Sequence, residues 1–428
     1  MKELNWDNIF KILSEYTQQK HYYLLFDKYN LKKRSSRLDM ALELQKSVKD
    51  TGMLGPVVSE STMEDWLSLH QIDGNNYTFV YNLNESPDSK HLDYLYTNKN
   101  NLVNLRLSDV DVNQLAEDVL GLNNSGLDEI KLIGIHRDEL KRKYIFSYVT
   151  SCLVNEPNEQ ADLQYYKKLF FCHCVLFVES KDCKVIFNPT SHLVHVNNVR
   201  KRKRHDWSPI SNMFFENFKG LIGEKVTTIP PEWIPHALYR LAEDATGHNN
   251  PIITSLSFGA QSTIEKFANQ LLKEANIETE KEMALKNKFI QDIQLSFEMQ
   301  LIEKYGFKQT EDEISIFKQR SDGVTHIISV ESTYEGLKSG AAAEAARRSR
   351  KNSDIDLLGV ILKHKGHIYK FLVEYYENAY LIRGTNTFVE EEVVNIVCNK
   401  LNEYKEQIQN DINETPTYRE NITGTEDK

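Results

Sequence analysis

The chain has 428 residues, of which 40% are hydrophobic and 27% charged, and its formal net charge is −10. This composition argues against a wholly disordered chain, and the acidic balance does not favour a general polyanion binder. The length predicts two or three domains of roughly 100–200 residues each. Because no apolar run approaches the ~18 residues of a membrane span, we expect no membrane association and a cytoplasmic protein.

Residues 1–158 predict an N-terminal module of mixed helices and strands. Apolar spacing indicates helices over most of residues 1–50 and another after Ser59, and strand-like pieces follow at residues 77–81 and 92–96. Helix, turn, helix and a strand pair is the order of a winged helix, and also of other modules that mix helices and strands. The polar segment at residues 156–159 is the predicted domain boundary.

Residues 159–261 predict a β-rich middle domain that passes into helix. Strands are expected at residues 169–178, 184–187 and 193–196, with a helix around residues 231–246. Five basic residues directly follow the last of these strands. Because Pro209 comes soon afterwards and disfavours helix before it, we expect the basic residues in an exposed loop.

Residues 262–410 predict a C-terminal unit, and residues 411–428 a polar tail. A helical pair is expected at residues 262–275 and 279–305, since both helices open on a Ser or Thr with Glu three residues later. Two strand pairs follow, at residues 314–330 and 355–375, and then a terminal helix. The fold class we expect is therefore α+β, multi-domain, with antiparallel β-hairpins mixed with helical pairs.

The basic run is the main indication of function. Between residues 163 and 204 nine Lys or Arg stand against two acids, and clustered exposed cations favour a phosphate backbone through counterion release. Neighbouring aromatic and imidazole rings offer stacking on bases. We therefore expect a non-enzymatic nucleic-acid-binding protein, DNA or RNA, that uses Arg200, Lys201, Arg202, Lys203, Arg204, His205 and Trp207. A smaller cluster, Lys32, Lys33, Arg34 and Arg37, is a second place for phosphate contacts.

Carboxylates in the C-terminal unit predict an enzyme as the alternative. Asp354 and Asp356 open an expected strand, and Glu374 lies on the next one. The Asp-x-Asp piece resembles the nucleotidyltransferase superfamily, although Ala341 stands where that family has Ser after its Gly. The same carboxylates also resemble those of restriction-type nucleases, although Tyr376 stands where these have Lys. Either resemblance implies Mg²⁺ held by Asp354, Asp356 and Glu374, whereas the binding hypothesis needs no cofactor.

Two further hypotheses remain open. Cys172, Cys174 and Cys183 with a nearby His could hold zinc, or could be small buried side chains of a strand. The basic loop could instead dock an acidic protein, which would make the chain a scaffold subunit of a larger complex.

Overall fold

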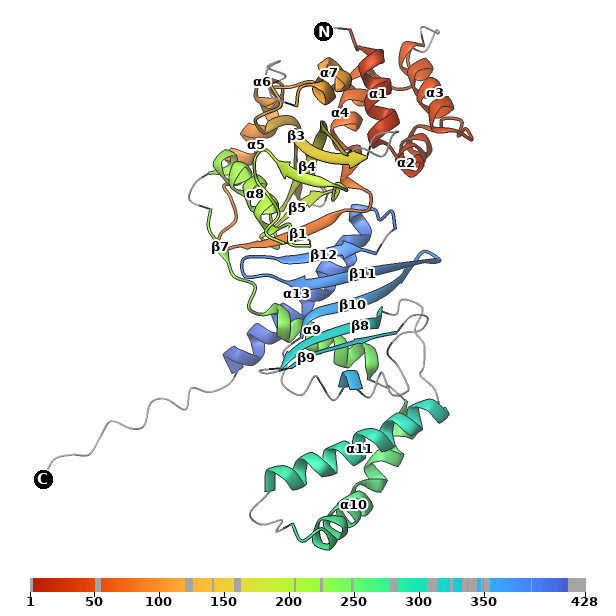
Figure 1. Cartoon of the computed structure of the whole chain (residues 1–428), viewed down its shortest axis with the longest axis vertical. Coiled ribbons are helices and arrows are strands. Elements are labelled where there is room, and N and C mark those ends of the chain that lie inside the picture. Colours follow the sequence, from red (N-terminus) through yellow and green to blue (C-terminus); the bar gives the residue numbers. More distant parts are fainter. Residues whose placement is uncertain are drawn as a thin grey trace, which may run out of the picture. The chain divides into compact units, whose positions relative to one another are not determined.

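The computed structural model describes residues 3–50, 55–119, 126–140, 142–157, 163–203, 205–223, 226–247, 250–277, 283–305, 314–323, 326–332, 337, 345–347, 349, 355–385 and 387–414. The chain forms two compact units (Figure 1). The first contains residues 1–231 and 376–394, and the second contains residues 232–375 and 395–428. Both mix helices with antiparallel strands, which confirms the α+β fold class.

The first unit is built on an antiparallel sheet with the strand order β2-β3-β4-β5-β1-β12. The short strand β6 pairs with β3 beyond the end of β2, and β7 pairs with β1. The bounds are β1 Tyr77–Leu83, β2 Lys131–Asp138, β3 Lys143–Pro157, β4 Leu163–Phe177, β5 Asp182–Phe187, β6 Leu193–Val196, β7 Thr228–Ile229 and β12 Tyr380–Gly384.

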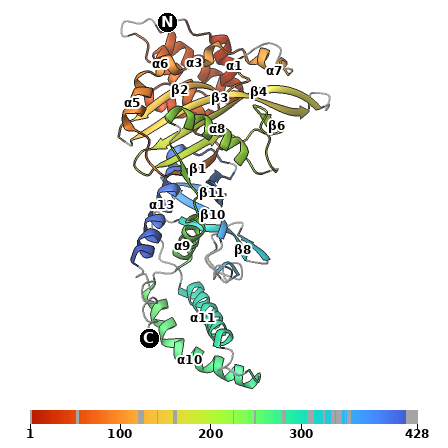
Figure 2. The same ribbon diagram turned by 90° about the vertical axis from the view of Figure 1, so that its left-hand side faces the viewer.

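Helices cover both faces of this sheet (Figure 2). One face carries α1 Trp6–Tyr16, α2 Gln19–Tyr29, α3 Arg37–Lys49, α4 Glu60–Leu69 and α7 Val112–Glu117, which share a core with Val149, Leu169 and Phe171. The other face carries α5 Ser89–Thr97 and α8 Ser208–Ile222. The short elements η1 His70–Ile72, α6 Lys99–Leu102 and η2 Leu107–Asp109 join these helices. Because both faces are covered, the central strands are nearly continuous apolar runs in the sequence.

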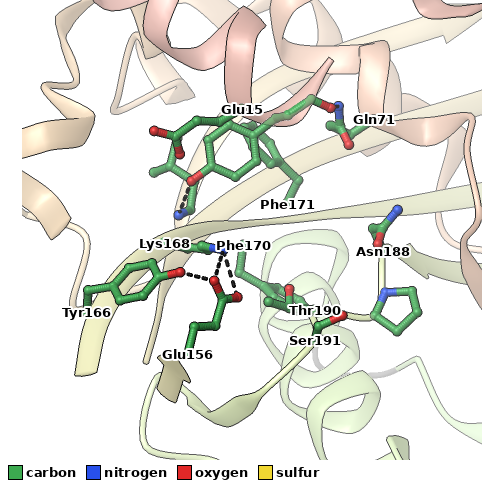
Figure 3. Close-up of a pocket in the computed structure, with 13 residues that line it drawn as sticks. Glu15, Gln71, Glu156, Tyr166, Lys168, Phe170, Phe171, Asn188, Thr190 and Ser191 are labelled. Atoms are coloured by element: carbon green, nitrogen blue, oxygen red, sulfur yellow. Dashed lines mark hydrogen bonds and ion pairs between the residues drawn. The ribbon is translucent and has the colours of Figure 1, made fainter. Parts of the chain in front are cut away.

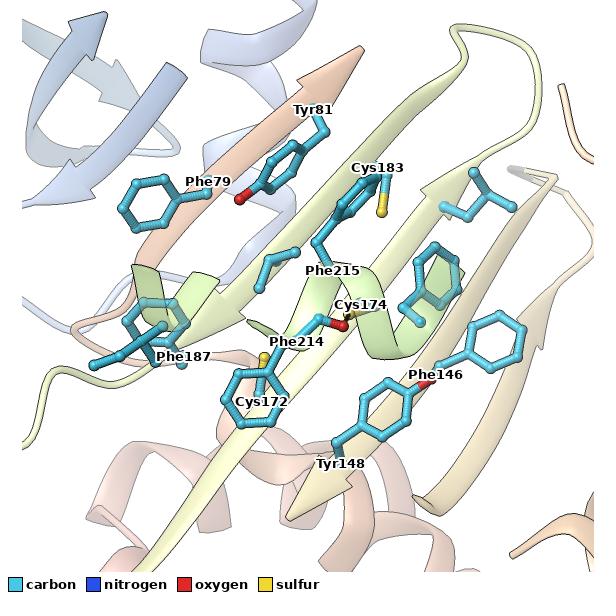
Figure 4. Close-up of a cluster of buried hydrophobic side chains, with 14 of the residues drawn as sticks. Phe79, Tyr81, Phe146, Tyr148, Cys172, Cys174, Cys183, Phe187, Phe214 and Phe215 are labelled. Carbon is cyan, nitrogen blue, oxygen red and sulfur yellow. Dashed lines mark hydrogen bonds between the residues drawn. The ribbon is translucent and has the colours of Figure 1, made fainter. Parts of the chain in front are cut away.

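Aromatic rings fill the core beneath α8 (Figure 4). The ring of Tyr81 stacks on that of Phe215 at 4.2 Å between centroids, and its hydroxyl donates to Asn212 Oδ1 at 2.7 Å. Three cysteines of the zinc hypothesis, Cys172, Cys174 and Cys183, are buried among these rings. Burial raises the pKa of the Cys174 and Cys183 thiols well above their usual values, so these side chains pack as neutral groups. Within the described ranges, no His, Cys, Asp and Glu gather as a metal site.

Several expectations for the first unit are wrong. Residues 92–96 are helical in α5, because Leu92 and Leu95 are spaced to bury one helix face, so the predicted wing is absent from this place. The polar segment near residue 158 connects β3 and β4, which pair from Lys143 opposite Phe177 to Pro157 opposite Leu163. A boundary there would divide one hairpin, and the tip itself lies outside the described residues.

The second unit contains a smaller antiparallel sheet and a long helical pair. Its strands, in the order β11-β10-β8-β9, are β8 Ile314–Gly323, β9 His326–Glu331, β10 Ile355–His364 and β11 His367–Tyr375. The helices are α9 Ile234–Thr246, α10 Pro251–Glu274 and α11 Met283–Tyr305, and α13 Glu391–Glu414 begins in the first unit and continues into this one. No helix that the structure describes has the length and apolarity needed to cross a membrane.

Both predicted strand pairs of the second unit are confirmed, and so is its helical pair. Lys365 and Gly366 have positive φ values of 48° and 76° in the two-residue turn between β10 and β11. The expected boundary at residue 262 is wrong, because α10 begins eleven residues earlier, where Asn250 caps it by accepting from the Ile252 amide at 3.0 Å. The expected tail from residue 411 is partly helical, since α13 extends to Glu414.

A buried ion triad joins α13 to the large sheet. Glu391 accepts from Lys143 Nζ at 2.9 Å, and Lys184 Nζ lies 3.8 Å from its other carboxylate oxygen. The three side chains are 4%, 7% and 2% exposed, respectively. Asp73 fixes the helix start by accepting from the Glu391 amide at 2.7 Å, and burial raises the pKa of Asp73 to about 7. The triad therefore attaches residue 391 to strands that are more than 200 residues earlier in the chain.

Three buried histidines and the half-buried His136 lie between α2, η1 and the sheet. His21 and His70 meet edge to face at 5.5 Å between ring centroids, and both line a 360 Å³ cavity with His136. His173 Nδ1 and Ser147 Oγ form a hydrogen bond of 3.0 Å, in which the tautomer of the imidazole decides which atom donates. Burial lowers the pKa of His21 and His136 to about 4 and of His173 to about 3, and it lowers that of His70 well below its usual value. All four are therefore neutral at pH 7.

Replacing Glu391 with Gln should destabilise the protein by about 3–5 kcal/mol, because it removes the carboxylate that lies 2.9 Å from the buried Lys143 ammonium group. Glu392→Gln is the matched control, since Glu392 shares the first turn of α13 but is exposed. Chemical denaturation of both variants measures the difference. Equal stability of the two variants would show that the buried triad contributes little.

The buried histidines should make the fold sensitive to acid. Their folded-state pKa values lie below the unfolded value near 6.5, so the unfolded chain binds more protons as the pH falls below 6.5. Between pH 6.5 and 5 each contributes a loss of about 1.5 kcal/mol, and Asp73, whose pKa is raised, opposes part of it. Denaturation at several pH values should show this fall, and His173→Phe should reduce its slope. An unchanged slope in that variant would contradict the assignment.

Candidate nucleic-acid interface

The basic segment, residues 200–205, is held between a tight turn and a helix start. Val196 and Val199 exchange two backbone hydrogen bonds, at 3.0 and 2.8 Å, across Asn197 and Asn198. Both asparagines have positive φ, which is typical of a two-residue hairpin turn. The Asn197 amide also donates to Ser151 O on β3 at 3.3 Å. The first half of the segment is therefore positioned by β6 and β3.

The far end of the segment is fixed by α8. The Asp206 amide donates to Lys203 O at 3.1 Å, and the Asp206 carboxylate accepts from the Ser208 amide and hydroxyl at 3.1 and 2.6 Å. The segment is thus an exposed loop on the sheet, as its sequence predicts. Arg204 lies outside the described residues.

Most of the cations in this loop face solvent. Arg200, Arg202, Lys203 and His205 are exposed. Among the residues whose positions are described, no carboxylate lies within 4 Å of Arg200, Arg202 or Lys203. These three side chains therefore keep their charge uncompensated by any described neighbour, which is the arrangement that phosphate contacts need.

Trp207 does not fit its expected role of stacking on bases. Its side chain is only 4% exposed, and its ring packs 5.8 Å from those of both Tyr77 and Phe187, measured between centroids. Lys201 Nζ lies 4.6 Å from the centroid of the same ring. Trp207 is a core residue that supports the loop through Lys201, and the sequence missed this because a Trp beside a charge run looks exposed.

The other cations counted near the run are engaged elsewhere. Lys167 pairs with Asp128 at 2.8 Å and Lys168 with Glu156 at 2.9 Å. Lys184 belongs to the buried triad, and Lys181 donates to a backbone carbonyl at 3.3 Å. The sequence count of nine cations against two acids therefore overstates the free positive charge, because the compensating acids lie outside that window.

The N-terminal basic cluster is also largely compensated. Lys33 lies 2.6 Å from an Asp27 oxygen, and Arg34 lies 2.6 Å from a Glu43 oxygen. Arg37 donates to the carbonyls of Ser14 and Thr17 at 3.3 and 3.2 Å, where it links α3 to α1. These contacts stabilise the helices of the first unit and compensate most of the positive charge of the cluster. The basic segment is therefore the better candidate interface.

The predicted metal site is occupied by an arginine. Asp356 accepts from Arg320 Nε at 2.9 and 3.0 Å, and Glu374 accepts from the Arg320 guanidinium at 2.9 Å. Hydrogen bonds to Asp356 and then to Glu374 raise the pKa of Arg320, so it remains a cation. The two carboxylates do lie on neighbouring strands, but an arginine supplies their counter-charge in place of Mg²⁺. Asp354 lies outside the described residues.

The first unit also contains a cavity of 570 Å³ with polar and apolar walls (Figure 3). Glu15, Tyr16 and Gln71 line one side, Glu156, Tyr166 and Lys168 another, and the loop before β6 closes it at residues 188–191. Glu156 accepts from Lys168 at 2.9 and 3.1 Å and from the Tyr166 hydroxyl. Although burial opposes it, these hydrogen bonds lower the pKa of Glu156, which stays ionised. The cavity gathers residues far apart in the sequence, so no spacing in the sequence could reveal it.

Comparisons with known proteins do not assign this chain to a family. No protein-family model matches it, and no curated protein matches it. The solved structure of an RNA-binding light-oxygen-voltage receptor aligns with 78% of this chain and 98% of its own at 9% identity, with a TM-score of 0.08. A likeness this slight carries no argument about fold or function, so any functional inference rests on the geometry described above.

Proposed function

We propose that the protein binds nucleic acid without catalysis, and that the basic segment contacts the phosphate backbone. The observation that carries this proposal is the exposure of Arg200, Arg202 and Lys203 with no described carboxylate within 4 Å. Other surface cations, such as Lys33, Arg34 and Arg106, lie close to an acid. Unpaired cations gain more from a phosphate partner, because no ion pair has to be broken first.

Two properties of the loop support phosphate binding over sequence recognition. The backbone is held at Val196–Val199 and at Asp206, so the main chain of the segment loses little conformational freedom on binding. The Trp207 ring is buried and cannot stack on bases, so among the described residues of the basic segment His205 carries the one exposed ring. We therefore expect contacts to phosphates with little dependence on base sequence.

The enzyme hypothesis has less support in the described residues. Arg320 lies between Asp356 and Glu374, and the cavity beside Glu156 contains an ion pair in place of an activated nucleophile. Carboxylates that already neutralise an arginine gain less from a divalent cation.

Neutralising the loop should weaken nucleic-acid binding. The variant carries Arg200→Gln, Arg202→Gln and Lys203→Gln, and fluorescence anisotropy with duplex DNA and with single-stranded RNA measures affinity at several salt concentrations. We expect the slope of log affinity against log salt to fall by about 1 for each phosphate that the protein no longer neutralises.

The matched control removes the same charge from the N-terminal cluster, through Lys32→Gln, Lys33→Gln and Arg34→Gln. This variant should bind as the wild type does, because these cations are already paired or lie beside paired ones. Failure of the wild type to bind either nucleic acid, or an equally weakened affinity in both variants, would overturn the proposal.

A further inference from the structure

The helical pair α10–α11 exposes an unusual amount of apolar surface. Among the described residues eighteen large hydrophobic side chains are exposed, and eight of them lie on these two helices: Ile252, Leu256, Phe258, Phe267, Leu271, Met283, Leu285 and Tyr305. Single exposed hydrophobic residues are ordinary, but a concentration of them marks an interaction surface.

Four of the five large exposed apolar residues of α10 form a row beside the buried one. Ile253 packs against Met299, Leu301 and Ile302 of α11, and Ile264, Ala268 and Leu272 continue the buried stripe. Ile252, Phe267 and Leu271 each directly precede one of these buried residues. Since one residue turns an α-helix by about 100°, the exposed row lies next to the face that packs on α11.

The exposed row reads the same in both directions along the helix. Its members are the exposed residues Ile252, Leu256, Thr263, Phe267 and Leu271 and the half-buried Ala260, and the six follow one another at spacings of four, four, three, four and four residues. An antiparallel copy of α10, related by a two-fold axis between residues 261 and 262, would place Ile252 opposite Leu271 and Leu256 opposite Phe267. The small residues Ala260 and Thr263 would then meet at the axis, where the helices approach most closely.

We propose that this row binds a second copy of the chain through antiparallel α10–α10 pairing. A two-fold interface uses the same surface on both copies and must be self-complementary, which the symmetry of the row satisfies. The distribution of charge agrees. Residues 251–264 contain no charged side chain, whereas Glu265, Lys266, Lys273 and Glu274 occupy the other end of α10. Antiparallel pairing puts this charged end opposite the uncharged end, so no like charges meet.

The exposed area suits a dimer that dissociates on dilution. Ile252, Leu256, Phe267 and Leu271 are 54%, 41%, 52% and 36% exposed. At roughly 200 Å² for a large apolar residue, the row presents about 350 Å² per copy. A standard interface buries about 800 Å² per partner, of which a little over half is apolar, so the row supplies most of that apolar share. The absence of cations from residues 251–264 disfavours a phosphate or anionic lipid surface as the occupant.

Light scattering of the full chain over a dilution series tests the pairing. At the highest concentrations we expect twice the chain mass of 49.8 kDa. Leu256→Lys and Phe267→Glu should each give monomers, with dimer affinity reduced about 100-fold or more, because each places two charges in an apolar contact. Phe258→Glu is the matched control: Phe258 is 79% exposed but lies about 200° around the helix from Leu256, so this variant should remain dimeric.

Mixing the two monomeric variants makes the test specific to the proposed register. In a heterodimer the new Lys at position 256 faces the new Glu at position 267, and the second Leu256–Phe267 contact is intact. An equimolar mixture should therefore recover the double mass, with circular dichroism confirming that each variant is folded. A monomeric wild type at every concentration, a dimer in either single variant, or a mixture that stays monomeric would overturn the proposal. A different protein captured by this face would leave the wild type monomeric when it is alone.

Discussion

The carboxylate of Glu391 is the constraint on which the first unit depends. It lies between Lys143 on β3 and Lys184 on β5, and all three side chains are nearly inaccessible to solvent. A buried ammonium group without a counter-charge costs several kcal/mol, so the centre of the sheet needs a residue from the C-terminal part of the chain. This explains why residues 376–394 belong to the same unit as residues 1–231, which no local sequence pattern indicates.

The basic segment depends on the same strands. Strand β6 pairs with β3 at residues 152–154, and the turn after β6 donates a hydrogen bond to Ser151 O. Strand β3 therefore positions the loop, and the triad holds β3 through Lys143. The Lys201 ammonium group also packs on the ring of Trp207, which contacts Phe187 in the aromatic core, and this contact holds the loop against the core. If the chain dimerises through α10, each particle carries two such loops.

Local patterns predicted the elements well and the assembly poorly. The turn at Lys365-Gly366 is a local signal, and the hairpin that it indicates is present. Leu92, Tyr94 and Tyr96 alternate as they would in a strand, whereas Leu92 and Leu95 share one face of a helix, and the burial of this second pair decides for helix. The pairing of Arg320 with Asp356 and Glu374, and of Lys167 with Asp128, joins residues more than 30 positions apart. Charge counts along the chain cannot anticipate such partners.

Photocrosslinking to RNA would locate the proposed phosphate contact on the chain, whereas a binding curve would only detect it. The protein is irradiated with bound single-stranded RNA that contains a photoreactive base, and is then digested after Glu. We predict that the crosslinked nucleotide lies on the fragment of residues 180–216, which contains the whole basic segment. Crosslinks confined to other fragments, in a complex that forms under the same conditions, would contradict the assignment of the basic segment as the interface.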